Sequence, residues 1–219
     1  MSPGTLRWRI VCEAIATALL LIAVVGSGIM AERLSGGNTA LALLANSIAT
    51  GGALFALILT FGPQSGAQMN PAVTLAAAWQ GELPAATAAA YVAAQVAGAI
   101  AGAWLAHAMF ALPILQTGQH VRTGFGQWLA EAIATFGLLA VIAGSRRHGI
   151  PATAGAVAAY ITGAYWFTAS TSFANPAVTV ARALSDSFAG IAPGDAPGFI
   201  AAQVVGMALA LPLLKRLRA

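Results

Sequence analysis

The sequence predicts an all-α membrane protein in which six transmembrane helices and two shorter re-entrant half-helices form an inverted repeat. Three observations support this prediction: an apolar composition, an internal repeat and a pair of Asn-Pro-Ala motifs. Of the 219 residues, 59% are hydrophobic and only 7% are charged. So few charges cannot cover the surface of a soluble domain of this length, so we expect the lipid bilayer to surround the chain.

Six apolar stretches are long enough to cross the bilayer core, which takes about 20 residues in a helix. The first stretch follows basic residues, as the apolar part of a signal sequence does. It is longer than such a segment and contains Glu13 and Thr17, so we expect a retained helix. The six predicted spans cover residues 10–30, 40–61, 85–108, 126–144, 150–169 and 197–214.

The basic residues predict how the chain is oriented in the membrane. With six spans, the two termini and the link between the fourth and fifth spans lie on one side, which carries seven of the ten Lys and Arg residues. The positive-inside rule makes this side cytoplasmic, with both termini inside. These residues lie at helix ends, as expected for basic residues that flank membrane spans. No nucleic-acid partner is therefore predicted. The seven basic residues are Arg7, Arg9, Arg146, Arg147, Lys215, Arg216 and Arg218.

The two halves of the chain repeat each other in the same order. Three sequence matches recur at offsets of 118, 105 and 108 residues, and only the loop lengths differ. We therefore expect a single domain over residues 1–219, with repeats at about 8–110 and 125–217. Each repeat holds three spans, an odd number, so the second enters the bilayer upside down relative to the first. The matched pairs are 13–17 with 131–135, 70–74 with 175–179, and 94–98 with 202–206.

The motifs Asn70-Pro71-Ala72 and Asn175-Pro176-Ala177 interrupt the apolar sequence once in each half. Asn is a favoured residue just before a helix, and Pro is favoured at the first helical position. The motifs therefore predict half-helices at about 71–80 and 176–185, too short to span the bilayer. Inversion brings them in from opposite faces, so that their N-terminal ends, each with about half a positive charge, meet near the midplane.

The loops before the two motifs, residues 62–69 and 170–174, are predicted to line a pore. Irregular backbone is tolerated at membrane depth only inside protein or beside a watery cavity. The amides of Asn70 and Asn175 would offer donors to a passing solute. Such a conduit suits small neutral molecules and needs no cofactor and no metal. Its acceptors would be the carbonyls of Gly66, Ala67, Gln68, Ser172, Phe173 and Ala174.

Two such motifs in an inverted six-helix repeat resemble the aquaporin and aquaglyceroporin (major intrinsic protein) family, over nearly the whole chain. The resemblance implies a passive transmembrane channel that assembles as a homotetramer with one pore in each subunit. It also implies that Glu13 and Glu131 are structural buried acids. Their expected role is to accept hydrogen bonds from the re-entrant loops, with a proton relay as the alternative.

Members of this family usually narrow the pore with four residues, one of them an Arg that directly follows the second Asn-Pro-Ala. Here that residue is Val178, and counting back from the motifs places the other three at Thr50, Gly163 and Ser172. The loss of the guanidinium predicts a widened filter without Arg. Arg182 lies one helical turn after Val178. We expect it to face the outer rim or to cap a loop, with replacement of the missing charge as the alternative.

The segment Ser172 to Thr179, Ser-Phe-Ala-Asn-Pro-Ala-Val-Thr, resembles bacterial family members associated with arsenic resistance. This resemblance implies a protein of the bacterial inner (plasma) membrane. The implied solutes are arsenite As(OH)3, methylated arsenicals and glycerol-like molecules, as well as water.

Other functions are left open by the sequence. A strict water channel, an ion-coupled secondary transporter and a sealed structural member of the family are the alternatives to this channel. An enzyme is not predicted, because His107, His120 and His148 have no metal-ligand spacing and no nucleophile stands with a base.

Overall fold

The computed structural model describes residues 4–217 and is built from helices. Arg218, one of the basic residues used to predict the orientation, lies outside the described residues. In chain order the elements are α1 (Leu6–Leu34), α2 (Thr39–Ser65), α3 (Pro71–Trp79), α4 (Ala85–Met109), α5 (Phe125–Ser145), the short 3-10 helix η1 (Arg146–His148), α6 (Ile150–Phe167), α7 (Pro176–Arg182) and α8 (Ala196–Leu217).

The six predicted spans correspond to α1, α2, α4, α5, α6 and α8, and the two predicted half-helices correspond to α3 and α7. Five helices of the described chain are long and apolar enough to cross a membrane; in these, the α5 span runs on through η1 to His148. The exception is α6, which has 18 residues and contains Tyr160, Tyr165 and Trp166. These polar-tipped aromatic side chains lower its hydropathy relative to the other five.

Local sequence sets where several helices begin and end. The Asn38 side chain accepts a hydrogen bond from the Leu41 N–H at 3.1 Å and so caps α2. At the other end of α2, Gly66 has a φ of 94°, a left-handed conformation that glycine adopts without steric cost. This residue turns the chain from α2 into the first re-entrant loop.

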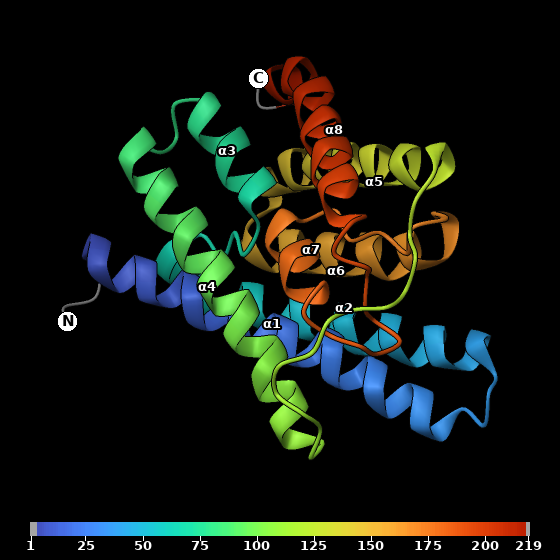
Figure 1. Cartoon of the computed structure of the whole chain (residues 1–219). Coiled ribbons are helices and arrows are strands. Elements are labelled where there is room, and N and C mark those ends of the chain that lie inside the picture. The colour runs from blue at the N-terminus through green and yellow to red at the C-terminus, as the bar shows by residue number, and fades with distance from the viewer. Residues whose placement is uncertain (1–3, 218–219) are drawn as a thin grey trace.

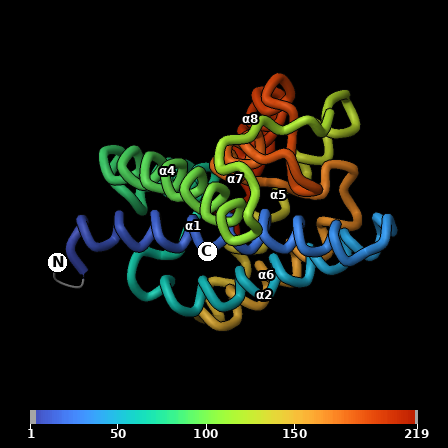
Figure 2. Tube along the Cα trace, turned by 60° about the horizontal axis from the view of Figure 1, so that its bottom comes forward, coloured from blue at the N-terminus to red at the C-terminus, as the bar shows by residue number. Residues whose placement is uncertain are grey.

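The two halves pack in equivalent ways (Figure 1). In the first half α1 packs against α2 and α4, and in the second half α5 packs against α6 and α8. Figure 2 shows α1 lying between α4 and α2. The halves are joined by the contact of α2 with α6, and both half-helices contact α4 and α8. Each half-helix is therefore held by long helices of both repeats.

Glycines permit the closest helix crossings in both halves. A Cβ added to Gly98 would overlap the carbonyl oxygen of Ala14, and one added to Gly206 would overlap that of Ala132. Both pairs join equivalent helices, α1 with α4 and α5 with α8. Small residues at such crossings let backbones approach closely in lipid, where packing rather than water exclusion holds helices together.

The outer surface of the helices is apolar. Large hydrophobic side chains are exposed along several helices, including Ile48 and Phe55 on α2, Leu105 on α4, Ile133 on α5 and Leu209 on α8. Exposed apolar area on this scale is what a hydrocarbon environment requires and what a monomeric soluble protein avoids.

Candidate functional site

The two Asn-Pro-Ala motifs begin α3 and α7 in the same way. The Asn70 Oδ1 accepts a hydrogen bond from the Ala72 N–H at 2.9 Å, and the Asn175 Oδ1 accepts one from the Ala177 N–H at 3.0 Å. Pro71 and Pro176 occupy the first helical position, where a missing N–H costs nothing. Proline and alanine of each motif thus build the first helical turn, and the asparagine faces the interior.

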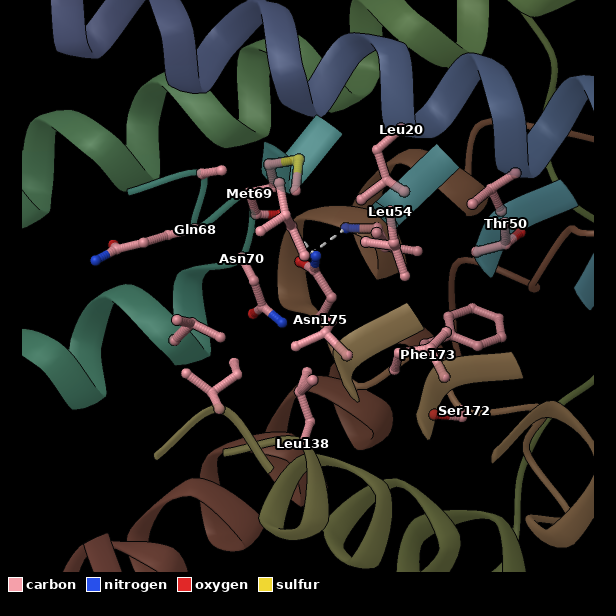
Figure 3. Close-up of a pocket in the computed structure, with 18 of the residues that line it drawn as sticks. Leu20, Thr50, Leu54, Gln68, Met69, Asn70, Leu138, Ser172, Phe173 and Asn175 are labelled. Carbon is pink, nitrogen blue, oxygen red and sulfur yellow. Dashed lines mark hydrogen bonds between the residues drawn. The ribbon is translucent and has the colours of Figure 1, made fainter. Parts of the chain in front are cut away.

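The two asparagines tie the halves together across the centre of the molecule. The Asn70 Nδ2 donates to the Ala174 carbonyl at 2.8 Å, and the Asn175 Nδ2 donates to the Met69 carbonyl at 2.8 Å. Figure 3 shows the two amide side chains next to each other in the middle of the cavity. Each amide has two N–H donors, so each keeps one donor for a solute.

The loops before the motifs share an unusual backbone conformation. Ala67 and Met69 have φ angles of 45° and 49°, and the equivalent Ser172 and Ala174 have 51° and 46°. Left-handed residues other than glycine are strained and persist only where their surroundings hold them. Here the surroundings include Glu13 and Glu131, which accept hydrogen bonds from backbone N–H groups of the two loops.

Glu13 of α1 holds the first re-entrant loop from behind. Its Oε1 accepts hydrogen bonds from the Ser65 hydroxyl at 2.6 Å and the Gln68 N–H at 3.0 Å. Its Oε2 accepts from the Met69 N–H and the Gln95 Nε2, both at 2.8 Å. The fully buried carboxylate is therefore surrounded by four donors, which offset the cost of removing it from water.

Glu131 of α5 holds the second loop with the same four kinds of donor. Its Oε1 accepts from the Ser170 hydroxyl at 2.6 Å and the Phe173 N–H at 2.8 Å. Its Oε2 accepts from the Ala174 N–H at 2.8 Å and the Gln203 Nε2 at 2.6 Å. Both acids thus act as acceptors for loop backbone in this structure, and neither lines the central cavity.

An internal cavity of about 110 Å³ runs between the two half-helices. Its walls repeat as the sequence does: Leu20 and Val24 of α1 are matched by Leu138 and Ile142 of α5. The α2 stripe of Thr50, Leu54 and Ile58 is matched by Thr153, Val157 and Ile161 of α6. Two arginines, Arg146 of η1 and Arg182 of α7, also border the cavity.

Three of the four predicted filter residues lie in the wall of this cavity: Thr50, Ser172 and Val178. In Figure 3, Thr50 and Ser172 lie beyond Asn175 on the side opposite Gln68. The Thr50 hydroxyl lies 3.2 Å from the hydroxyl of Tyr165, and these two form a hydrogen bond. The buried Ser172 hydroxyl has no hydrogen-bond partner within the described residues, so it has a donor and lone pairs to offer to a solute.

Gly163, the fourth predicted filter residue, is not among the residues that line the cavity, so its place in the filter stays a prediction. The α6 face that lines it is marked by residues spaced four apart, ending with Ile161 and Tyr165. Gly163 lies two positions from each of them and so points to another side of the helix, since two residues turn an α-helix by about 200°. Tyr165, which the sequence analysis missed, takes this place in the wall.

The loop carbonyls divide into two groups. Those of Gly66, Ala67, Gln68, Ser172 and Phe173 belong to cavity-lining residues. Within residues 4–217 they accept no hydrogen bond from protein, so they are free to accept one from a solute. Ala174 is not among the residues that line the cavity, and its carbonyl accepts the hydrogen bond from the Asn70 amide.

The arrangement carries donors, acceptors and apolar walls but no centre for chemistry. Among the described residues, no group of three or more His, Cys, Asp or Glu side chains is placed to hold a metal ion. The polar groups of the cavity can bind and release a small molecule along its length.

Comparison with known proteins agrees with this geometry. The profile of the major intrinsic protein family matches residues 3–170. The chain belongs to the major intrinsic protein family. It is 55% identical over 215 residues to aquaglyceroporin AqpS of Rhizobium meliloti (strain 1021), which covers 98% of this chain and 92% of that protein. Its fold matches the X-ray structure of the aquaglyceroporin from Plasmodium falciparum with a TM-score of 0.75, at 19% sequence identity, over 97% of this chain and 100% of that one.

Membership of the major intrinsic protein family makes the chain a multi-pass membrane channel for small solutes rather than an enzyme. The predicted resemblance is therefore confirmed, as is the predicted fold of long membrane helices with two re-entrant helices. The cavity between α3 and α7 is lined by the asparagines of both motifs, Asn70 and Asn175.

Proposed function

We propose that the chain is a passive channel of a bacterial plasma membrane for neutral solutes that carry several hydroxyl groups. The proposed solutes are glycerol-like molecules, arsenite As(OH)3 and methylated arsenicals, together with water. The observation that carries the proposal is Val178. An apolar side chain lines the cavity directly after the second motif, where the resemblance leads one to expect an Arg.

The mixed character of the cavity wall supports solutes of this class. One part of the wall is aliphatic, including Leu54 and Ile161, and suits the carbon skeleton of a small polyol. Donors and acceptors are supplied by Asn70, Asn175 and Ser172 and by the loop carbonyls. A small trihydroxy molecule can exchange hydrogen bonds with these groups in turn while its charge stays zero, which avoids the cost of dehydrating an ion.

Passive conduction is supported by the placement of the acids. The cavity wall contains no acidic side chain within the described residues. Glu13 and Glu131, the buried acids of the membrane helices, each accept four hydrogen bonds from protein groups. Neither has the free coordination that an ion-coupled transporter needs at its coupling site.

The relative that is named an aquaglyceroporin supports the glycerol-like part of the proposal. The arsenical part rests on the Ser172 to Thr179 motif and on the chemistry of As(OH)3, a small neutral molecule with three hydroxyl groups. We also propose a homotetramer, and an orientation with both termini in the cytoplasm. In that orientation Arg146 lies at the inner mouth and Arg182 toward the outer mouth.

A strict water channel is the second candidate function. It is favoured by Tyr165 and Arg182, because an aromatic ring and a guanidinium in the wall both narrow the space beside Val178. The two candidates differ in whether glycerol and arsenite pass.

The test is flux into proteoliposomes that contain the purified full chain. We expect water, glycerol and arsenite to enter faster than into empty liposomes, without a proton or sodium gradient. Val178→Arg should lower glycerol and arsenite flux on the order of 10-fold and water flux less, because a guanidinium fills the aperture and adds charge. Val178→Leu, which adds volume without charge, is the matched control and should cause a smaller loss.

Three outcomes would contradict the proposal. Water flux without glycerol or arsenite flux would establish the strict water channel. Flux that collapses without an ion gradient would establish a coupled transporter. Equal solute flux before and after Val178→Arg would remove Val178 from the constriction.

A further inference from the structure

Arg182 is a buried cation in the wall of the cavity. It occupies the last residue of α7 and is only 2% exposed. Its Nε donates a hydrogen bond to the Ala189 carbonyl, which belongs to the segment between α7 and α8. Its Cζ lies 3.4 Å from the centre of the Phe173 ring, a cation–π contact that fixes the plane of the guanidinium. The side chain therefore caps a loop and borders the cavity at the same time.

Among the described residues Arg182 forms no ion pair, and the acid that acts on its charge, the buried Glu131, does so from beyond ion-pair distance. Within residues 4–217, the ion pair formed is that of Arg146 with Glu82, and no carboxylate lies within ion-pair distance of Arg182. A second cation reinforces the positive field, since the Arg122 Cζ lies 5.3 Å from the centre of the same Phe173 ring. Arg122 is held by the Gly190 carbonyl at 2.8 Å and does not line the cavity.

Helical spacing explains how Arg182 reaches the place where the family's Arg is missing. Val178 and Arg182 are four residues apart on α7, so their side chains lie on one face about 5–6 Å apart at Cβ. Both line the cavity. The hydroxyl of Ser172, buried and without a protein partner, lines it as well.

We propose that Arg182 supplies the fixed positive charge of the conduit, one helical turn away from Val178, and thereby excludes cations. The proposal rests on the channel function proposed above and assigns its ion barrier to one residue. A charge without an ion-pair partner, in surroundings of low dielectric constant, repels another cation strongly, whereas a neutral solute is not repelled. The same guanidinium has further N–H groups besides the Nε–H. These can donate hydrogen bonds to a hydroxyl oxygen of the solute.

The experiment compares guanidinium with urea, a pair of nearly equal shape in which only one member is charged. The unaltered full chain in proteoliposomes should pass urea and exclude guanidinium. Arg182→Met should raise the guanidinium-to-urea flux ratio on the order of 10-fold. Arg122→Met, which removes the other cation on Phe173 but leaves the cavity wall intact, should raise the ratio less than Arg182→Met does, because Arg122 does not line the cavity. Arg182→Gln, which keeps a donor for the Ala189 carbonyl, is a second charge-free variant.

Relocation of the charge sharpens the test. Val178→Arg combined with Arg182→Met returns a guanidinium to the residue after the motif, and it should restore the exclusion of guanidinium lost in Arg182→Met alone. The proposal is overturned if the unaltered channel passes guanidinium as fast as urea, or if a charge-free variant that still passes urea keeps the original ratio. Absence of urea and water flux in the unaltered chain would instead refute the channel function itself.

Discussion

The two re-entrant segments are held by equivalent hydrogen bonds but present different side chains to the cavity. They cover residues 65–79 and 170–182. Each is held by a buried Glu that accepts bonds from a Ser hydroxyl, two backbone N–H groups and a Gln. Where the first segment has Gln68, the second has Phe173, and where the first has Ala77, the second has Arg182. The hydrogen bonds that hold the two segments are therefore symmetric, whereas the side chains that line the cavity are not.

The difference follows from what each position must satisfy. A loop at membrane depth has no water to pair its N–H groups, so both loops need an internal acceptor. The positions that face the cavity carry no such requirement, because solute and water can meet them. The repeat therefore gives the two re-entrant segments the same support, and our proposal assigns selectivity to residues at which the halves differ, such as Phe173 and Arg182.

The largest expected effect comes from breaking the shared support. Glu131→Leu leaves four donors without an acceptor, and at about 1 kcal/mol or more for each, the free energy of unfolding in detergent should fall by about 4 kcal/mol or more. Glu13→Leu should cost the same, because its surroundings are the same. Denaturant unfolding of the purified protein and its yield from membranes measure both.

Near-isosteric and surface substitutions separate the causes. Glu13→Gln and Glu131→Gln should cost less than the leucine variants, since one acceptor oxygen survives in each. Asp186→Asn, at an exposed residue, should cost less than about 0.5 kcal/mol. A loss confined to one of the two acids would show that the halves are not supported equally.

Substitutions at the glycines of the helix crossings should lower stability equally in the two halves, and by less than the loss of Glu13 or Glu131. Gly98→Ala and Gly206→Ala each place a methyl group against a backbone carbonyl, of Ala14 and Ala132 respectively. Overpacking of this kind costs about 1–3 kcal/mol, and backbone cannot move aside as a side chain can. The same unfolding measurement applies.

Gly52→Ala is the matched control for the crossings. A Cβ at Gly52 meets nothing within 4 Å, and alanine is the better helix former by about 0.5–1 kcal/mol. This variant should be as stable as the unaltered protein or more stable. A loss as large as that of the crossing variants would show that helix contact is not the cause.

The sequence predicted the symmetric part of the site well because its causes are local. The asparagine caps, the proline at the first helical position and the apolar length of the spans are all read within a few neighbouring residues. The half-helices were predicted at about 71–80 and 176–185 and are observed at Pro71–Trp79 and Pro176–Arg182. The hydrogen bond from Asn70 to Ala174, 104 residues away, depends on how the two halves pack together, so neighbouring residues could not predict it.

The asymmetric part was predicted less well. Counting back from the motif chose Gly163, but the rotation of α6 brings Tyr165 to the wall; the four-residue spacing of Thr153, Val157 and Ile161 would have pointed to it. The position of Arg182 depends on the segment after α7, which folds back so that the Ala189 carbonyl meets the guanidinium. The two residues are only seven positions apart, but the return of an irregular loop leaves no periodic signal in the sequence.

The smallest predicted effect on stability concerns Arg146, the more exposed of the two arginines that border the cavity. The Arg146 Nη1 lies 2.9 Å from the Glu82 Oε2, and the two side chains are 38% and 30% exposed. Solvent screens such a pair, which contributes about 0.2–1 kcal/mol. Glu82→Gln should therefore lower the free energy of unfolding by less than about 1 kcal/mol.

Glu82→Gln should also leave the guanidinium-to-urea flux ratio unchanged, in contrast to Arg182→Met. Arg146 meets solvent, whose high dielectric constant weakens its field, whereas Arg182 is enclosed and has no acid partner among the described residues. Both properties are measured on the same proteoliposomes. A shift of the ratio in Glu82→Gln as large as that in Arg182→Met would mean that the barrier to cations is shared by both mouths, and the asymmetry of the two halves would then not set ion exclusion.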